Sequence, residues 1–175
     1  QSAYELLTTK DLFRAGALAQ QLDNYNLQRK DIMHAIQQKV ITEANALDPD
    51  TPVIISVSED YEEGVVGLAA GRVAESFYKP AIIGRLEDGS IKASCRTIPE
   101  FNIVEALDHC ADLLHHYGGH AMAAGLSLDY SKLPEFQERI TRYANQTLAG
   151  LELTPELAID YEISLAQLKP EHIPG

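Results

Sequence analysis

The sequence lacks the features that mark secreted and membrane proteins. Its two cysteines, Cys95 and Cys110, lie apart and give no disulfide framework, so we expect a reducing, cytoplasmic location. No apolar run approaches the length of a membrane span, and residues 1–10 lack the basic-then-apolar order of a signal peptide. We therefore expect no membrane partner. The first residue is Gln1 rather than Met, so we expect a piece of a larger protein.

Positive charge is scarce as well. Fourteen Lys and Arg stand against 26 Asp and Glu, which gives a formal net charge of −12. Non-specific binding to nucleic acid is dominated by contacts between cations and phosphates, so this composition excludes a protein that coats nucleic acid electrostatically. Any contact with nucleic acid must be local. It would depend on a few placed arginines and on backbone amides.

Hydrophobic periodicity predicts an α/β fold with a mixed β-sheet flanked by helices and preceded by a long connector helix. A break at Asp23-Asn24-Tyr25-Asn26 divides the first helical region in two, and Asp88-Gly89 predicts a hairpin turn. The predicted helices cover residues 11–22, 27–47, 64–78, 102–116 and 133–148. The predicted strands cover residues 53–57, 81–86, 91–96, 124–128 and 157–163, the last of them alternating like an edge strand.

The most informative stretch holds two adjacent glycines, one histidine and three alanines before a final glycine: Tyr117-Gly118-Gly119-His120-Ala121-Met122-Ala123-Ala124-Gly125. In a loop between a helix and a strand, adjacent glycines can turn bare backbone N–H groups toward an anion. His120 can donate a charge-assisted hydrogen bond or act as an acid. A simpler alternative is that Gly118 ends the preceding helix and that His120 has no special role.

A second candidate is the set Ser94, Arg96 and Thr97 at the end of a predicted strand. One guanidinium and two hydroxyl groups suit a phosphate, which arginine can grip with two parallel hydrogen bonds. Alone, the set is equally compatible with a solvated arginine. Together with the glycine-histidine stretch, it predicts a phosphate held by Arg96 and backbone amides beside His120.

Other kinds of site find little support in the sequence. His109, Cys110, His115, His116 and His120 crowd one stretch, but their spacing completes no zinc ligand set. We therefore predict no metal site and no cofactor in this chain. A nucleophile elbow and a dinucleotide-binding fingerprint are absent too. The glycine stripe of the helix over residues 64–78, Gly64, Gly67 and Gly71, predicts close packing or close approach of a ligand.

Three motifs resemble the DHHA1 domain of RecJ-type single-stranded-DNA-specific exonucleases, in the DHH/DHHA1 phosphoesterase superfamily. They are Tyr117 to Gly125, the run from Gly64 to Arg72, and Ser94-Cys95-Arg96-Thr97-Ile98-Pro99. The segment from Leu22 to Lys30 is similar to the start of that family's linking helix. The resemblance covers nearly the whole chain.

The resemblance implies a DHHA1-like substrate-binding domain over residues 49–150. Residues 1–48 would then be a helical connector from a DHH domain absent from this chain, and residues 151–175 a linker that starts a following OB-like domain. Mn or Mg would be held by that DHH domain, which would be the partner in cis. The implied substrate is single-stranded nucleic acid, DNA above all, cut in the 5′ to 3′ direction.

Site residues carry over by position. His120 would act at the cleaved phosphate, and Gly118, Gly119 and Ala121 would contact it through the backbone. Arg96, with Ser94 or Thr97, would anchor a neighbouring phosphate. One departure is Glu62, which stands where many relatives have histidine.

Two alternatives to the exonuclease remain open. The chain could belong to a DHH-type phosphodiesterase for short oligonucleotides or cyclic dinucleotides. It could also be a non-catalytic module that binds nucleic acid or protein. We expect the 175 residues alone to have no nuclease activity, because the metal-binding clusters are absent from the sequence.

Overall fold

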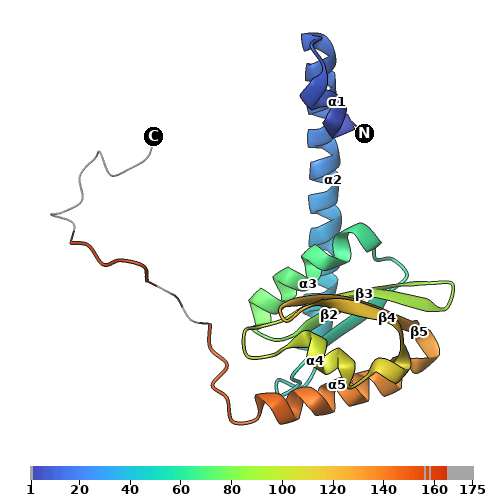
Figure 1. Ribbon diagram of the computed structural model, residues 1–175, viewed down its shortest axis with the longest axis vertical. Coiled ribbons are helices and arrows are strands. Elements are labelled where there is room, and N and C mark those ends of the chain that lie inside the picture. Colours follow the sequence, from blue (N-terminus) through green and yellow to red (C-terminus); the bar gives the residue numbers. More distant parts are fainter. Residues whose placement is uncertain (1, 156, 158, 165–175) are drawn as a thin grey trace.

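The computed structural model describes residues 2–155, 157 and 159–164. A short helix α1 (Ser2–Thr8) folds back beside the start of the long helix α2 (Leu12–Asn45), as Figure 1 shows. The carboxylate of Asp11 caps α2 by accepting hydrogen bonds from the backbone N–H groups of Phe13 and Arg14, at 2.9 and 3.2 Å. The predicted connector helix is confirmed.

The predicted break at residues 23–26 is wrong, because α2 runs through it without interruption. Asp and Asn cost only part of a kilocalorie per mole each inside a helix, roughly 0.7 kcal/mol at most. Side-chain pairs along the helix surface offset that cost. Gln21 Nε2 donates to the Tyr25 hydroxyl at 3.0 Å, and Arg29 Nη2 donates to Asn26 Oδ1 at 2.9 Å.

Five strands form one mixed sheet in the order β1-β2-β3-β5-β4. β1 (Ile54–Ser58) pairs in parallel with β2 (Ala81–Glu87), and all other neighbours are antiparallel: β2 with β3 (Ser90–Arg96), β3 with β5 (Ala123–Asp129), and β5 with β4 (Leu114–His120). The hairpin turn between β2 and β3 has positive φ at Asp88 (49°) and Gly89 (77°), as the sequence predicts.

Helices cover both faces of the sheet (Figure 1). On one side α3 (Glu63–Phe77) packs over β2 and β3, and the end of α2 packs on α3 and β1. Ile36, Val40, Val66, Ala70 and Ile83 are buried together there. The other side carries α4 (Ile103–Asp108), α5 (Leu133–Leu148) and the short 3-10 turns Ala111–Leu113 and Tyr130–Lys132. Among the described residues, none of the helices is both long enough and apolar enough to span a bilayer.

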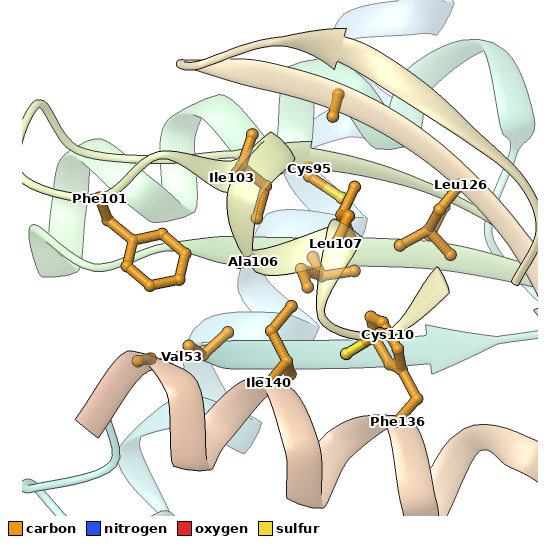
Figure 2. Packing of buried hydrophobic residues seen from close by; sticks show 14 of the residues in the cluster. Val53, Cys95, Phe101, Ile103, Ala106, Leu107, Cys110, Leu126, Phe136 and Ile140 are labelled. Carbon is orange, nitrogen blue, oxygen red and sulfur yellow. The ribbon is translucent and has the colours of Figure 1, made fainter. Parts of the chain in front are cut away.

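The larger core lies between the sheet and α5. Figure 2 shows Cys95 and Leu126 of the sheet, Leu107 of α4, and Phe136 and Ile140 of α5 directed into this layer. Both cysteines are free and buried. Burial raises the pKa of Cys95 to about 12 and that of Cys110 to about 11. Both thiols therefore stay protonated at neutral pH and serve as core side chains.

The predicted helix over residues 102–116 is correct only at its start. α4 ends at Asp108, where His109 Nδ1 lies 2.8 Å from the carbonyl oxygen of Glu105. The chain then turns at Cys110, which is fully buried, and enters β4. β4 pairs with β5 along its whole length, and this pairing outweighs the helical tendency of the stretch. The sequence alone does not reveal the pairing.

The other predicted helices and strands match the structure within two residues, and helix α1 was not predicted. The exception is the edge strand predicted over residues 157–163: the described residues of that stretch form no strand, and residues 156 and 158 lie outside the described part. The expected start of a following domain falls largely on residues 165–175, which also lie outside it.

Candidate phosphate-binding site

Strands β3 and β5 share one burial pattern in which every second residue is buried. The buried set faces α4 and α5. The other set faces the side where α3 lies. α3 packs over β2 and along β3, and β5 and β4 remain uncovered. We call this surface the open face; it consists of Lys92, Ser94 and Arg96 of β3, Ala123, Gly125 and Ser127 of β5, and His116, Gly118 and His120 of β4.

The register of the sheet brings most of the expected site residues together on the open face. Ser94 pairs with Gly125, which pairs with Gly118. In the next row, Arg96 pairs with Ala123, which pairs with His120. Because neighbouring strands lie about 4.8 Å apart, the backbones of Arg96 and His120 are separated by about 10 Å. Only the small side chain of Ala123 stands between them.

The predicted loop at Gly118 and Gly119 is wrong, and so is the alternative of a helix end at Gly118: both glycines lie in β4. β4 is an edge strand, so alternate backbone N–H groups have no partner in the sheet and point outward. Any backbone amide that this stretch offers to an anion therefore belongs to a strand edge rather than to a turn.

Gly118 and Gly125 form a cross-strand glycine pair that packing does not require. A Cβ atom on Gly118 would meet no atom within 4 Å, and one on Gly125 would touch only the carbonyl oxygen of Ala93, at 3.7 Å. Glycine weakens a strand, and its presence often marks a place where a ligand approaches the backbone. The pair leaves bare backbone in the row that holds Ser94.

Gly119 has a different role. Its φ is 152°, and a Cβ atom there would lie 2.3 Å from the carbonyl oxygen of Ala123 and 2.6 Å from the Cα atom of Ala124. Only glycine fits this position. Of the two adjacent glycines, Gly119 shapes the hairpin between β4 and β5, and Gly118 leaves the surface open.

The glycine stripe of α3 forms one wall of the site. A Cβ atom on Gly67 would lie 3.4 Å from both Arg96 Nη2 and Ser94 Oγ, and one on Gly71 would lie 3.9 Å from Arg96 Cγ. The absence of side chains at these two positions keeps Arg96 and Ser94 reachable. The close approach of α3 that the sequence predicts is directed at the expected phosphate ligands.

Arg96 has no carboxylate partner among the described residues, although the chain is rich in acids. Arg14, Arg72 and Arg139, by contrast, each form an ion pair. Arg96 Nη1 donates to the carbonyl oxygen of its neighbour Cys95 at 2.8 Å, which fixes the half-buried guanidinium beside α3. Its other N–H groups are left for an anion.

Thr97 and Ala121 lie beside the open face but contribute differently. The Thr97 hydroxyl is buried and donates to the carbonyl oxygen of Phe101 at 3.1 Å, so it is not placed with Ser94 and Arg96. Ala121 lies in the exposed turn between β4 and β5, and its carbonyl oxygen accepts a hydrogen bond from Ile103 N at 3.0 Å. These bonds hold the turn in place and so position His120.

A cavity of about 350 Å³ opens on this face. Its lining includes Ser94 and Gly125, and it also includes Lys92, His116 and Ser127, which motif reasoning missed. The available signal was the alternation along β3 and β5, which places Lys92 and Ser127 on the same face as Ser94 and Gly125. A second cavity, of about 640 Å³, adjoins the other end, and Arg96 lines this cavity rather than the first.

Within the described part of the chain, no group of three or more His, Cys, Asp or Glu side chains is placed to hold a metal ion. His109 and His115 have other partners. The His109 ring packs at a tilt of 39° against Tyr143, with ring centroids 4.3 Å apart, and His115 Nε2 lies 2.9 Å from Asp129 Oδ1. The donor set of the open face, with its arginine, hydroxyl and amide donors, suits an anion rather than a cation.

The Gly67→Ala variant separates folding from binding at this wall. We expect it to stabilise the fold by up to about 1 kcal/mol, because alanine favours a helix more than glycine does. Its methyl group would also cover Ser94 Oγ and Arg96 Nη2, so binding of phosphate ligands should weaken several-fold. Urea unfolding and a phosphate-ligand titration measure the two effects, and unchanged binding would contradict the placement of the ligand.

Comparison with known proteins gives matches over most of the chain. The DHHA1 domain family matches residues 50–146. The single-stranded-DNA-specific exonuclease RecJ of Bacillus subtilis is 31% identical over 173 residues, which are 98% of this chain and 22% of the relative. RecJ of Escherichia coli is 31% identical over 175 residues, 95% of this chain and 30% of the relative. The chain thus spans less than a third of these curated relatives.

Solved structures give the same picture of the fold. RecJ from Thermus thermophilus in complex with Mn²⁺ matches with a TM-score of 0.74 at 32% identity, over 83% of this chain and 21% of that one. A crystal structure of exonuclease RecJ bound to manganese matches with a TM-score of 0.75 at 30% identity, over 87% of this chain and 38% of that one.

Proposed function

Because the chain belongs to the DHHA1 domain family, as its motifs predict, we propose that it is the substrate-binding portion of a RecJ-like, metal-dependent exonuclease acting on single-stranded DNA. The proposed reaction is hydrolysis of phosphodiester bonds in the 5′ to 3′ direction. The observation that carries the proposal is the convergence of Arg96, Ser94 and the glycine pair on the same face of the sheet. Similarity to proteins named RecJ supports it.

In this proposal the open face grips the DNA backbone. Arg96 and the Ser94 hydroxyl bind one phosphate, with the guanidinium supplying two parallel hydrogen bonds. The bare backbone at Gly118 lets the sugar-phosphate chain lie against the sheet. Recognition through backbone phosphates carries no sequence information, which suits an enzyme that removes successive nucleotides.

His120 is the catalytic residue in the proposal. It stands at the exposed end of β4, in the row of Arg96, and its imidazole N–H can stabilise negative charge that develops on the cleaved phosphate. The described residues do not offer a ligand set for Mn²⁺ or Mg²⁺. We place the metal ligands, and the activation of water, in a DHH domain elsewhere in the longer protein.

The connector and the domain boundaries belong to the same proposal. Residues 1–48 link the DHH domain to a substrate-binding domain over residues 49–150, and residues 151–175 lead to a following OB-like domain. Exposed apolar side chains at the far end of the connector, Leu7 (85%), Leu12 (86%) and Phe13 (94%), support a neighbouring domain there.

Glu62 restricts where the DNA backbone can lie. Glu62 is exposed and precedes α3, and its side chain makes no capping hydrogen bond. A carboxylate at this place repels a backbone phosphate. The path of the DNA therefore follows the β3, β5 and β4 side of the cavity rather than the start of α3.

The proposal is tested with the 175-residue chain and a fluorescently labelled single-stranded oligonucleotide. We expect salt-sensitive binding that weakens in His120→Ala, and no release of nucleotides when Mn²⁺ or Mg²⁺ is added, because the metal ligands are elsewhere. His115→Ala is the matched control, since His115 lies at the other end of β4 and pairs with Asp129. Binding that is indifferent to both salt and His120 would contradict the proposal.

A further inference from the structure

The open face continues past Ser94 toward the start of β3. In the next cross-strand row, Lys92 of β3 pairs with Ser127 of β5, which pairs with His116 of β4. This row supplies an ammonium group, a hydroxyl group and an imidazole, all of which can donate a hydrogen bond to an anionic oxygen. None of the three belongs to the motif residues that carry the proposed function.

The row shares one cavity with Ser94 of the first phosphate site. Lys92, Ser127 and His116 line the 350 Å³ cavity together with Ser94 and Gly125. Positions two residues apart along a strand are about 7 Å apart. Successive phosphates of an extended single strand recur at a comparable interval. A strand that places one phosphate at Ser94 and Arg96 can therefore place an adjacent phosphate over the Lys92 row.

The charged groups nearest this row are Glu63, Arg85 and Glu87, which line a small pocket together with Lys92, and Arg85 and Glu87 pair with each other. Lys92 Nζ lies 3.3 Å from Glu63 Oε2 in the first turn of α3, and the two side chains are 60% and 57% exposed. An ion pair so exposed is weak, so Lys92 can exchange the carboxylate for a phosphate. Beyond the row, Asp129 is bonded to His115. Among the described residues that line the cavity, Glu63 is therefore the one carboxylate.

We propose that Lys92, Ser127 and His116 form a second phosphate subsite, which takes the next backbone phosphate of a single-stranded oligonucleotide. The inference rests on the proposed function, which assigns the first phosphate to Ser94 and Arg96. Lys92 neutralises the second phosphate, and Ser127 and His116 donate to its oxygens. The chain then binds two consecutive backbone phosphates, and Glu63 lowers its affinity for the oligonucleotide by competing for Lys92.

The test compares a ligand with one phosphate, thymidine 5′-monophosphate, with a ligand with two, the 5′-phosphorylated thymidine dinucleotide. We expect Lys92→Ala to weaken dinucleotide binding about threefold to tenfold at low salt and to leave mononucleotide binding unchanged. Glu63→Gln should tighten dinucleotide binding. With a longer oligonucleotide, Lys92→Ala should reduce the slope of log K against log salt concentration by about 0.7.

Lys30→Ala is the matched control, because it removes the same charge from the exposed surface of α2, outside the cavity lining. Suppose that dinucleotide affinity is the same in the Lys92 and Glu63 variants as in the wild type, while mononucleotide affinity still depends on Arg96. That result would overturn the second subsite and leave the proposed function standing. If neither ligand bound, the second subsite and the proposed function would both be contradicted. If Lys30→Ala and Lys92→Ala lost equal dinucleotide affinity, the effect would come from net charge alone, and the second subsite would be overturned.

Discussion

Replacing Arg96 with alanine should weaken binding of a 5′-phosphorylated single-stranded oligonucleotide by about tenfold to a hundredfold, since hydrogen bonds to charged groups contribute about 1.5–3 kcal/mol. The reason is local: among the described residues Arg96 is not neutralised by any carboxylate, and Gly67 keeps its Nη2 atom reachable. Fluorescence anisotropy at low salt measures the loss. The fold should be unaffected, because the Nη1 bond to Cys95 spans adjacent residues.

Two further substitutions test whether Arg96 binds the phosphate through its charge alone or through two parallel hydrogen bonds. Arg96→Lys keeps the charge but loses the planar pair of donors, so binding should recover only in part. Arg72→Ala is the control, because Arg72 lies on the exposed side of α3 in an ion pair with Glu75. Full recovery in Arg96→Lys would show that charge alone matters and would contradict two-bond recognition of the phosphate. An equal loss in Arg72→Ala would contradict a local site.

Replacing Gly119 with alanine should destabilise the fold by about 3 kcal/mol or more, through backbone strain and overpacking together. The new Cβ atom would meet the carbonyl oxygen of Ala123 and the Cα atom of Ala124, neither of which can move without breaking the hairpin between β4 and β5. Unfolding in urea, followed by circular dichroism, measures the change in the free energy of unfolding.

Gly118→Ala is the matched control for Gly119→Ala. It adds the same methyl group one residue earlier, in open space, so the free energy of unfolding should change by less than about 0.5 kcal/mol. Binding of the oligonucleotide should nevertheless weaken, because the methyl group stands on the open face beside Gly125. Similar stability losses in both variants would contradict the separate roles of the two glycines.

Much of the fold follows from patterns that the sequence displays locally. The Asp88-Gly89 turn, the glycine stripe of α3 and the amphipathic helix α5 are encoded by residues close together in the chain, and they form as predicted. The mixed sheet follows from the order of helices and strands. Motif resemblance identifies the DHHA1 domain, which the family match confirms.

The errors have a common physical cause, which is pairing at long range. Residues 114–116 read as the end of a helix, but β5 offers them a partner strand, and pairing decides the outcome. The same event turns Gly118 and Gly119 from an expected loop into a strand edge. Lys92 was not predicted as a site residue because it is not paired with His116 directly. Ser127, on a third strand, pairs with both. Only the register shows it.

The most direct test of the central claim, that the open face of β3, β5 and β4 receives the backbone of single-stranded DNA, is an NMR titration of the ¹⁵N-labelled chain with a short 5′-phosphorylated oligonucleotide. We predict salt-sensitive shifts centred on the amides of Ser94, Arg96, Gly118 and Gly125, with α5 unaffected. Shifts centred on α5 or spread along α2, or no shifts at low salt, would contradict it.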